Sequence, residues 1–328
     1  MKTLIINEIE VEKALTIEAC IPVMAEALTS LARGEVFQPQ RIVVTPQDSK
    51  GLMAMMPICL SGDGAIYGLK AICVFPGNPE KGLDAHQGAV MLFSADTGEL
   101  LAMMNASAIT ATRTSAVSAL ATKWLAPEEA GDLAIIGAGV QALAHLTAMA
   151  AVRSLRRARI ADCDFSRAQD LVKKVRDQFA FPIQAMEDIQ RAVEGADIVV
   201  TVTTATEPVI MREWISPGAH INAVGACTPT AREIDTSTMA SASLFVDRRE
   251  ATLTEAGDYL LAAQEGAIGP DHIRAEIGEV IIGLKEGRTS AQEITLFKSL
   301  GLAVEDLAAA QYIYQKARSQ NIGTWLEF

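Results

Sequence analysis

The sequence predicts an α/β protein of two domains, one of them built on a doubly wound parallel sheet. The chain has 328 residues, more than the roughly 100–200 residues of a typical domain. From Gly131 onward, short apolar runs alternate with helix-like stretches, as expected for a parallel sheet covered on both faces. The pattern Gly137-Ala138-Gly139 lies between one such run and the next helix. Together these observations predict a nucleotide-binding fold.

Composition and charge narrow the class of protein. Hydrophobic residues make up 50% of the chain and charged residues 21%, which is typical of a well-packed globule and excludes a disordered chain. The net charge of −12 repels phosphate backbones, so we expect no nucleic-acid partner. Residues 133–152 carry no formal charge and are long enough to cross a bilayer, but their glycines and polar residues favour a strand, a turn and a helix. We therefore expect no membrane association.

The cysteines and histidines of the sequence indicate a protein of a reducing compartment, and they indicate no metal site. The five cysteines are odd in number and show no CxxC spacing, which favours reduced thiols in a cytoplasmic protein. The four histidines are scattered, so we expect no metal. The first residues lack the basic start and long apolar stretch of a signal peptide.

The first third of the chain predicts a mixed domain with a mostly antiparallel sheet. We expect helices at 16–33 and 107–125, the first from apolar residues at spacings of three and four. Asp96-Thr97-Gly98 predicts a hairpin turn inside the apolar run 89–104. Further strands are expected at 1–6, 41–45, 51–56 and 65–75.

The second part predicts a parallel sheet. Strands are expected at 133–136, 158–162, 198–203, 221–224 and 244–247, with helices at 140–151 and 166–179. A last helix, 303–318, lies beyond the alternating region, and we expect it to return to the first domain.

The glycine pattern is the first sign of chemistry. Gly137 permits a tight turn, Gly139 lets the backbone approach a diphosphate, and Ala142 lets helix and strand pack closely. The phosphates would face N–H groups at the positive end of the helix dipole. The candidate cofactor-binding residues here are Gly137, Ala138, Gly139, Val140 and Gln141.

Asp162 ends the second strand of this region and is a candidate ligand for the ribose hydroxyls of a dinucleotide. An NADP site would more often place Arg, Ser or Thr at the next position, which is Cys163, while Arg167 lies in the following helix. This favours NAD(H) and leaves NADP(H) open.

Several short motifs follow one another along the chain. They are Gly68-Leu69-Lys70-Ala71, Phe75-Pro76-Gly77-Asn78-Pro79, His86-Gln87-Gly88, Thr110-Ala111-Thr112-Arg113-Thr114-Ser115-Ala116, Asn222-Ala223-Val224-Gly225 and Glu293-Ile294-Thr295-Leu296-Phe297-Lys298-Ser299. Taken together, these motifs resemble the ornithine cyclodeaminase/mu-crystallin family over essentially the whole chain.

The resemblance implies a Rossmann domain inserted into a second, α+β domain that binds substrate and forms a homodimer. The boundaries we expect are 1–120 plus 312–328 for the second domain and 121–311 for the Rossmann domain. The implied chemistry is NAD(P)H-linked redox at an α-amino or α-imino acid.

Three cations match positions that hold the substrate carboxylate in the resembled family: Arg41, Lys70 and Arg113. A guanidinium can bind a carboxylate through two hydrogen bonds, and a buried ammonium can exchange a proton near neutral pH, which makes Lys70 the candidate acid/base. Without the resemblance, Arg41 could form a surface salt bridge and Lys70 could point outward from its strand. The position of Arg113 on a helix would by itself indicate no function.

Five further residues are candidate cofactor contacts from the resemblance or from the ends of predicted strands: Thr114, Thr203, Val224, Gly225 and Lys298.

Cys227 is a departure from the resembled family. Ornithine cyclodeaminases and the archaeal-type alanine dehydrogenases have an Asp at the matching position. Here we interpret Cys227 as a small neutral wall, with an activated thiolate as the alternative. Loss of the carboxylate weakens reactions that need water attack, whereas reduction of a preformed imine needs only a carboxylate clamp, a hydride and a proton.

The sequence therefore favours a ketimine reductase acting on Δ1-pyrroline-2-carboxylate or Δ1-piperideine-2-carboxylate. Ornithine cyclodeamination, alanine-type dehydrogenation and a non-enzymatic crystallin-like binding role stay open as alternatives.

Overall fold

The computed structural model describes residues 2–62, 64–78 and 81–327, so Met1 of the predicted first strand and Pro79 of one motif lie outside the described residues. The chain forms two compact units. The first joins Met1–Arg113 to Gly301–Phe328, and the second, Thr114–Leu300, is inserted between these segments. The insertion implied by the family resemblance is thus present.

The first unit is an eight-stranded sheet with helices on one face. Its strands follow the order β16-β1-β7-β6-β5-β4-β2, with β3 also paired to β4. All pairs are antiparallel except β1 with β7. The elements are β1 (Lys2–Ile6), α1 (Glu8–Ala14), α2 (Ile17–Ala32), β2 (Val36–Phe37), β3 (Ile42–Val44), β4 (Leu52–Leu60), β5 (Ile66–Val74), β6 (His86–Ser94), β7 (Leu100–Asn105), the start of α3 (Ala106–Leu125), α11 (Ala303–Gln320) and β16 (Thr324–Glu327).

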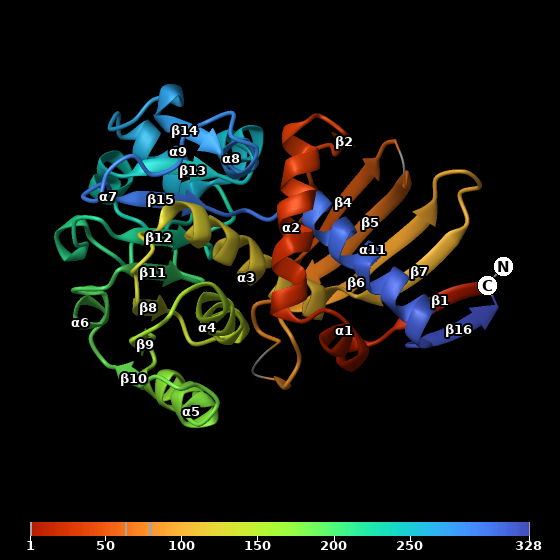
Figure 1. Ribbon diagram of the computed structural model, residues 1–328, viewed down its shortest axis with the longest axis horizontal. Coiled ribbons are helices and arrows are strands. Elements are labelled where there is room, and N and C mark those ends of the chain that lie inside the picture. The colour runs from red at the N-terminus through yellow and green to blue at the C-terminus, as the bar shows by residue number, and fades with distance from the viewer. Residues whose placement is uncertain (1, 63, 79–80, 328) are drawn as a thin grey trace. The chain divides into compact units, whose positions relative to one another are not determined.

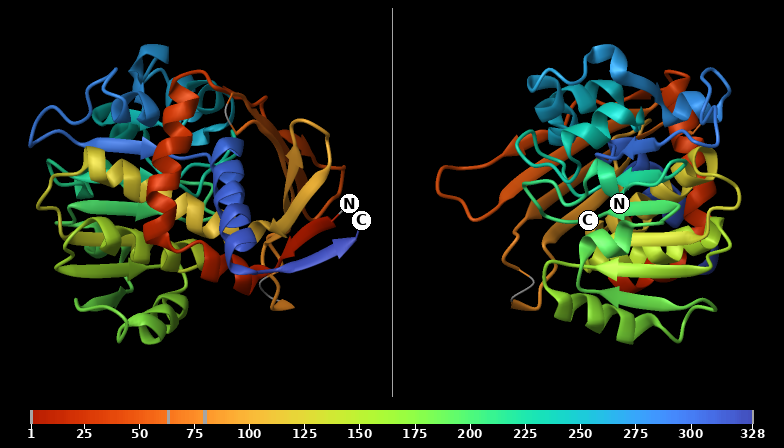
Figure 2. Two further views of the ribbon diagram at one scale, coloured as in Figure 1. Left: turned by 45° about the vertical axis from the view of Figure 1, so that its right-hand side comes forward. Right: turned by 90° about the vertical axis from the view of Figure 1, so that its left-hand side faces the viewer.

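Helices α2 and α11 pack side by side over this sheet (Figure 1). Helix α2 begins where the Thr16 hydroxyl caps the N–H of Ala19, and its buried residues recur every three or four positions. In β5, β6 and β7, alternate side chains are buried toward the helices, as the period of two in a strand requires. Figure 2 shows both termini where β16 pairs with β1.

The second unit is a parallel eight-stranded sheet of Rossmann type. Its elements are the rest of α3, β8 (Asp132–Ile136), α4 (Val140–Val152), β9 (Arg157–Ala161), α5 (Phe165–Val175), β10 (Ile183–Met186), α6 (Ile189–Val193), β11 (Ile198–Thr201), the 3-10 turn η2 (Arg212–Trp214), β12 (His220–Ala223), α7 (Thr236–Ser241), β13 (Ser243–Val246), α8 (Arg249–Glu255), α9 (Gly257–Gln264), η3 (Pro270–His272), β14 (Ile273–Glu276), α10 (Ile277–Ile281) and β15 (Thr295–Lys298).

The strand order is β10-β9-β8-β11-β12-β15-β13-β14. The chain starts in the middle at β8, proceeds outward to β10, and then returns to build the other half from β11. The reversal between β8 and β11 is a topological switch point, where open α/β sheets bind ligands at the carboxyl ends of their strands.

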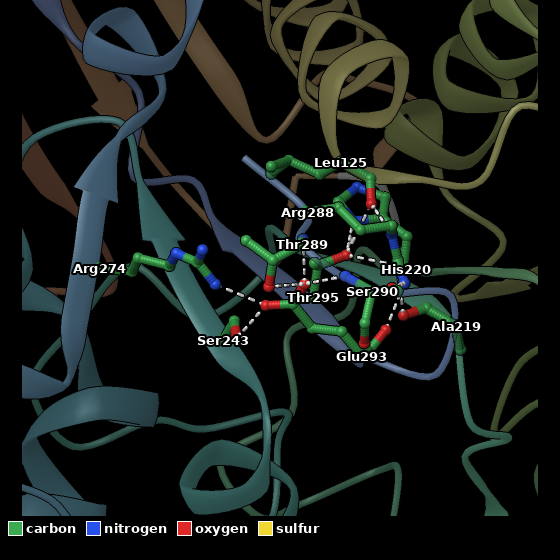
Figure 3. Close-up of polar contacts among 10 residues, drawn as sticks. All are labelled: Leu125, Ala219, His220, Ser243, Arg274, Arg288, Thr289, Ser290, Glu293 and Thr295. Atoms are coloured by element: carbon green, nitrogen blue, oxygen red, sulfur yellow. Dashed lines mark hydrogen bonds and ion pairs between the residues drawn. The ribbon is translucent and has the colours of Figure 1, made fainter. Parts of the chain in front are cut away.

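The amino ends of the central strands are tied together by Arg288 (Figure 3). Its guanidinium donates to the carbonyls of Leu125 at 2.6 Å and Ala219 at 3.2 Å, and to the Thr295 hydroxyl at 2.9 Å. Glu293 anchors the adjoining loop by accepting hydrogen bonds from Ser243, Arg274 and Thr289. These contacts join the end of α3 to β12 and β15. They lie at the amino ends of the strands, so the carboxyl ends are free of them.

The predicted domain boundaries need correction at both ends. The first division lies between Arg113 and Thr114, inside the continuous helix α3, rather than at 120/121. The second lies at 300/301, because the whole of α11 packs on the first sheet and α2, whereas the predicted boundary at 311/312 would cut that helix. The expected return of this helix to the first domain is confirmed.

Candidate cofactor and substrate sites

The glycine turn after β8 has the geometry of a phosphate-binding loop. Gly137 has φ +105°, and a Cβ there would lie 2.6 Å from the Val202 carbonyl oxygen, so only glycine fits. At Gly139 the nearest atom to such a Cβ would be a guanidinium nitrogen of Arg167, 3.9 Å away. The backbone of this residue is therefore open to a ligand, as close approach of a diphosphate requires.

The N-terminus of helix α4 has no side-chain cap. Helices α5, α6 and α7 are each capped by an aspartate side chain, whereas α4 begins uncapped at Gly139, as α8 and α9 also begin without a cap. Its first N–H groups are thus left for another acceptor, and the helix dipole favours an anion there. Gln141, in the first turn, also has a buried Oε1 without a hydrogen-bond partner among the described residues. The turn and helix end fit the diphosphate of a dinucleotide.

Asp162 follows β9 and joins the glycine turn to the next helix. One carboxylate oxygen accepts from the N–H of Ala138 at 2.8 Å, and the other accepts from the N–H of Asp164 at 3.0 Å. The oxygen that accepts from Ala138 can accept a second hydrogen bond, so these contacts are compatible with a ribose hydroxyl. The role of Asp162 toward ribose stays a prediction.

Glu233 organises the carboxyl ends of β11 and β12. Its buried carboxylate accepts from the Thr203 N–H at 2.6 Å, the Thr203 hydroxyl at 2.8 Å, the Thr201 hydroxyl at 2.9 Å and the Gly225 N–H at 2.6 Å. Burial raises the pKa of Glu233. The predicted residues Thr203, Val224 and Gly225 therefore lie together at one edge of the sheet.

Lys298 ends β15 beside this edge, and its ammonium is used within the domain. Its Nζ lies 2.9 Å from an Asp258 carboxylate oxygen and 3.2 Å from the Ala223 carbonyl oxygen, and the side chain is fully buried. Burial lowers the pKa of Lys298, but the carboxylates of Asp258 and Glu233 act against it, and the pKa rises. Its predicted cofactor contact stays a prediction, as does that of Thr114, which is buried in α3.

The three predicted cations converge in the first unit. Arg41 donates to the Gly301 carbonyl oxygen at 2.8 Å. Lys70 lies 3.1 Å from an oxygen of Asp306, and the same oxygen accepts from Arg113 Nε at 3.0 Å. Positions distant in sequence are thus gathered at the start of α11. The alternative of a lysine that points outward from its strand is excluded, because the side chain of Lys70 is buried.

Gly301 allows the guanidinium of Arg113 to come close to the start of α11. It has φ +77°, and a Cβ there would lie 2.4 Å from Arg113 Nη1. A second carboxylate, Glu305, accepts from the same Nη1 at 2.6 Å. Together the carboxylates of α11 hold Arg113 through Nε and Nη1, which fixes the plane of its guanidinium.

The surroundings of Lys70 make its proton mobile. Burial lowers the pKa of Lys70 to about 8, with Asp306 opposing the shift and Arg113 and Arg41 adding to it. A group with this pKa is largely protonated at neutral pH and can give up its proton during a reaction.

Two other titratable groups face the same cluster. Desolvation lowers the pKa of His86 on β6, and Lys70 and Arg113 lower it further. On α2, burial raises the pKa of the Cys20 thiol to about 12, so it stays protonated.

Four acidic residues of these sites were not predicted from the sequence: Glu233, Asp258, Glu305 and Asp306. One signal was present, since Glu305 and Asp306 are consecutive acids in the first turn of a helix whose first half is otherwise apolar. Such a pair needs cationic partners if the helix is buried.

Cys227 lies beside the hydrogen-bond network of Glu233, and it provides a thiol there instead of a carboxylate. Its Sγ donates to the Val224 carbonyl oxygen at 3.4 Å. The sequence showed no neighbouring cation, but the fold brings the charge of Lys298 within its influence.

Among residues 2–62, 64–78 and 81–327, no group of three or more His, Cys, Asp or Glu side chains could hold a metal ion. In the same residues no single helix is long and apolar enough to cross a membrane, although the bent pair α1 and α2 meets the criteria of length and composition alone. The uncharged stretch 133–152 forms β8, the glycine turn and α4.

Comparison with known proteins agrees with this geometry. The model of the ornithine cyclodeaminase/mu-crystallin family matches residues 1–321. The ketimine reductase mu-crystallin of Rattus norvegicus is 40% identical over 297 residues, 90% of each chain. The Thermococcus litoralis Δ1-pyrroline-2-carboxylate reductase, solved with NADH and L-proline, is 36% identical with a TM-score of 0.95, covering 98% of this chain and 99% of that one.

An archaeal alanine dehydrogenase, solved as a dimer with bound NAD, is 34% identical with a TM-score of 0.93 over the full length of both chains. Family match, identity and fold agree along the chain. The protein belongs to the ornithine cyclodeaminase/mu-crystallin family.

Proposed function

We propose that the protein is an NAD(H)-dependent reductase that converts a small cyclic imino acid, Δ1-pyrroline-2-carboxylate or Δ1-piperideine-2-carboxylate, to the L-amino acid. The observation that carries this proposal is the buried cluster around Lys70, where a lysine with a pKa of about 8 lies among two arginines. The reductase relative solved with NADH and L-proline supports the same reaction.

Each residue of the cluster has a defined task. Arg113 and Arg41 provide guanidinium donors for the substrate carboxylate. Lys70 provides the proton that the imine nitrogen gains when its double bond is reduced. NADH, when bound, supplies the hydride for the imine carbon.

The reducing reaction is favoured over ornithine cyclodeamination by the residue at 227. Cyclodeamination must release ammonia, and a carboxylate near the reacting carbon would assist that step. Cys227 instead donates its thiol hydrogen to the Val224 carbonyl, and a thiol with a backbone partner is a poor substitute. A preformed imine needs no such group.

We propose NAD(H) as the cofactor, held by the glycine turn, the uncapped end of α4 and Asp162. The carboxylate of Asp162 would accept from ribose hydroxyls and repel a 2′-phosphate. Relatives solved with NADH or NAD support this choice. Kinetics with NADH and NADPH test it, and a lower KM for NADPH would contradict it.

We further propose a homodimer formed through the face of the first sheet opposite α2 and α11. Apolar side chains that pair across neighbouring strands line this face, and they are only half-buried in the single chain. They are Pro57, Leu69, Met91 and Met103. An apolar surface of this kind is typical of a protein interface. The dimeric alanine dehydrogenase supports this proposal, and light scattering of the wild type and Met91→Glu tests it.

The compartment we propose is the cytoplasm. All five cysteines lack a disulfide, which suits a reducing environment.

The decisive experiment is NADH consumption by the purified protein with each cyclic imine. We expect oxidation of NADH and formation of L-proline or its six-membered homologue. Ornithine with NAD, and pyruvate with ammonia and NADH, run as parallel assays. Proline and ammonia from ornithine would favour cyclodeamination, alanine formation would favour an alanine-type dehydrogenase, and cofactor binding without any turnover would favour a binding protein.

A further inference from the structure

Asp306 occupies the centre of the cluster in the first unit. A single oxygen, Oδ1, accepts from both Lys70 Nζ at 3.1 Å and Arg113 Nε at 3.0 Å. The side chains of all three residues are at most 5% exposed. One carboxylate thus joins the candidate proton donor to the candidate carboxylate clamp.

The second oxygen of Asp306 reinforces this arrangement. Oδ2 is buried and has no hydrogen-bond partner among the described residues. A buried carboxylate with one unsatisfied oxygen is costly, and it is tolerated where its charge has a task. Here the charge lies against an ammonium that burial and two arginines push toward the neutral form.

We propose that Asp306 is the positioning residue that keeps Lys70 protonated and aims its ammonium, and that it ties this proton donor to Arg113. The inference rests on the proposed reductase function and deepens it. Asp306 acts through Lys70 and does not itself exchange a proton with the substrate.

The balance of charges around Lys70 explains why one carboxylate matters. Arg113 from α3 and Arg41 from the segment before β3 disfavour its charged form, and His86 on β6 faces the same group. Asp306 from α11 is the anion that opposes them, whereas Glu305 on the same turn pairs with Arg113. Removing Asp306 would leave the ammonium among cations.

The reaction step follows from this placement. With NADH as the hydride source, which would be oxidised to NAD+, a C–H bond would form at the imine carbon and the electron pair of the C=N double bond would move to nitrogen. An N–H bond of Lys70 would break as the proton passes to that nitrogen. Lys70 is left as a neutral amine and regains a proton from water. Asp306 favours the return of that proton because its charge stabilises the ammonium.

The test is the pH profile of imine reduction by Asp306→Asn. An opposite charge this close raises a lysine pKa by about 1–3 units, so its loss should move the alkaline limb of kcat/KM to lower pH by about that amount. Activity should recover toward the wild-type value as the pH falls and Lys70 is protonated again. A uniform loss at all pH values with an unmoved limb would mean that Asp306 is only structural.

Glu305→Gln is the matched control, because Glu305 bonds to Arg113 in the same helical turn. We expect it to raise KM for the imine and to leave the alkaline limb in place. A limb that moves equally in both variants would overturn the specific role of Asp306. If Asp306→Asn does not fold, Asp306→Glu replaces it: a limb near that of the wild type supports the proposal, and a limb shifted to lower pH contradicts it.

A measurement without turnover separates this inference from the proposed function. Lysine-selective ¹³C NMR, with the Lys70 signal assigned from Lys70→Met, follows its titration in the wild type and in Asp306→Asn. A fall in the pKa of Lys70 in the variant supports the electrostatic role even if neither cyclic imine is a substrate. An unchanged titration overturns it even if the imine is reduced.

Discussion

Two buried lysines, Lys70 in the first unit and Lys298 in the second, show opposite behaviour. Burial lowers the pKa of Lys70 to about 8, whereas the pKa of Lys298 is raised in spite of complete burial. Each has one aspartate within about 3 Å, at 3.1 Å for Lys70 and 2.9 Å for Lys298. The difference therefore lies beyond the nearest partner.

What differs is the sign of the charged groups that surround each lysine–aspartate pair. Lys70 faces Arg113 and Arg41, which disfavour its ammonium. Lys298 is instead surrounded by anionic groups, with Glu233 adding to Asp258. One lysine is thus prepared to give up a proton, and the other is a fixed cation that neutralises the carboxylates behind the carboxyl ends of β11 and β12.

The largest effect is expected from Lys70→Met. This substitution removes the proton donor but keeps most of the side-chain volume. General acid catalysis contributes about 10²–10⁴-fold, so kcat for imine reduction should fall by that factor. Steady-state kinetics measure the loss, and circular dichroism shows whether the variant is folded. Wild-type kcat in a folded variant would exclude Lys70 as the acid.

Lys298→Met should lower the stability of the folded protein. It leaves Asp258 as an uncompensated buried charge, and breaking such a pair costs about 3–5 kcal/mol of unfolding free energy. Urea unfolding followed by circular dichroism measures this cost. Lys298→Arg, which keeps the charge, is the control and should lose less. A Lys298→Met variant as stable as the wild type would show that the two lysines are not divided in this way.

Some features of the molecule could be predicted from the sequence, and others could not. The parallel sheet, the glycine turn and the return of the last helix follow from local patterns: a buried apolar run, then Gly137 and Gly139, then a helix. Arg41, Lys70 and Arg113 were identified by resemblance. Their convergence depends on pairing between strands and on α11, which lies some 190–260 residues away along the chain.

The acidic partners escaped prediction for the same reason. Nothing near Glu233 in the sequence indicates burial beside a cation, and the consecutive acids Glu305 and Asp306 indicate a need for cations without showing which ones. The division inside α3 was missed because a continuous helix carries no composition change at Arg113. The short strands β10 and β16 lack the length and apolar pattern that mark a strand.

A smaller effect is expected from Gly301→Ala, which disturbs the first cluster without removing a charge. A left-handed conformation costs a residue with a Cβ about 1–2 kcal/mol, and the new methyl group would also displace Arg113. We expect KM for the imine to rise about tenfold. Gly266→Ala, with a similar φ and no atom within 4 Å of the Cβ position, controls for backbone strain. An equal rise in KM in both variants would rule out a specific effect on Arg113.

The smallest effect needs no substitution. With a pKa of about 8, Lys70 is mostly protonated at pH 7 and about half protonated at pH 8, so kcat/KM for imine reduction should fall by about half between them. The pKa of His86 is lowered, which places its titration on the acidic side, away from this limb.

Stability should change in the opposite direction from activity over this range. The folded-state pKa of Lys70 lies below the ordinary value of 10.5, so between about pH 8 and 10.5 the unfolded chain binds more protons and this group's contribution to stability rises with pH. Loss of activity without loss of circular dichroism signal would therefore indicate titration of the proton donor. A profile that stays flat to pH 10 would mean that Lys70 is held as firmly as Lys298, and the contrast between the two lysines would fail.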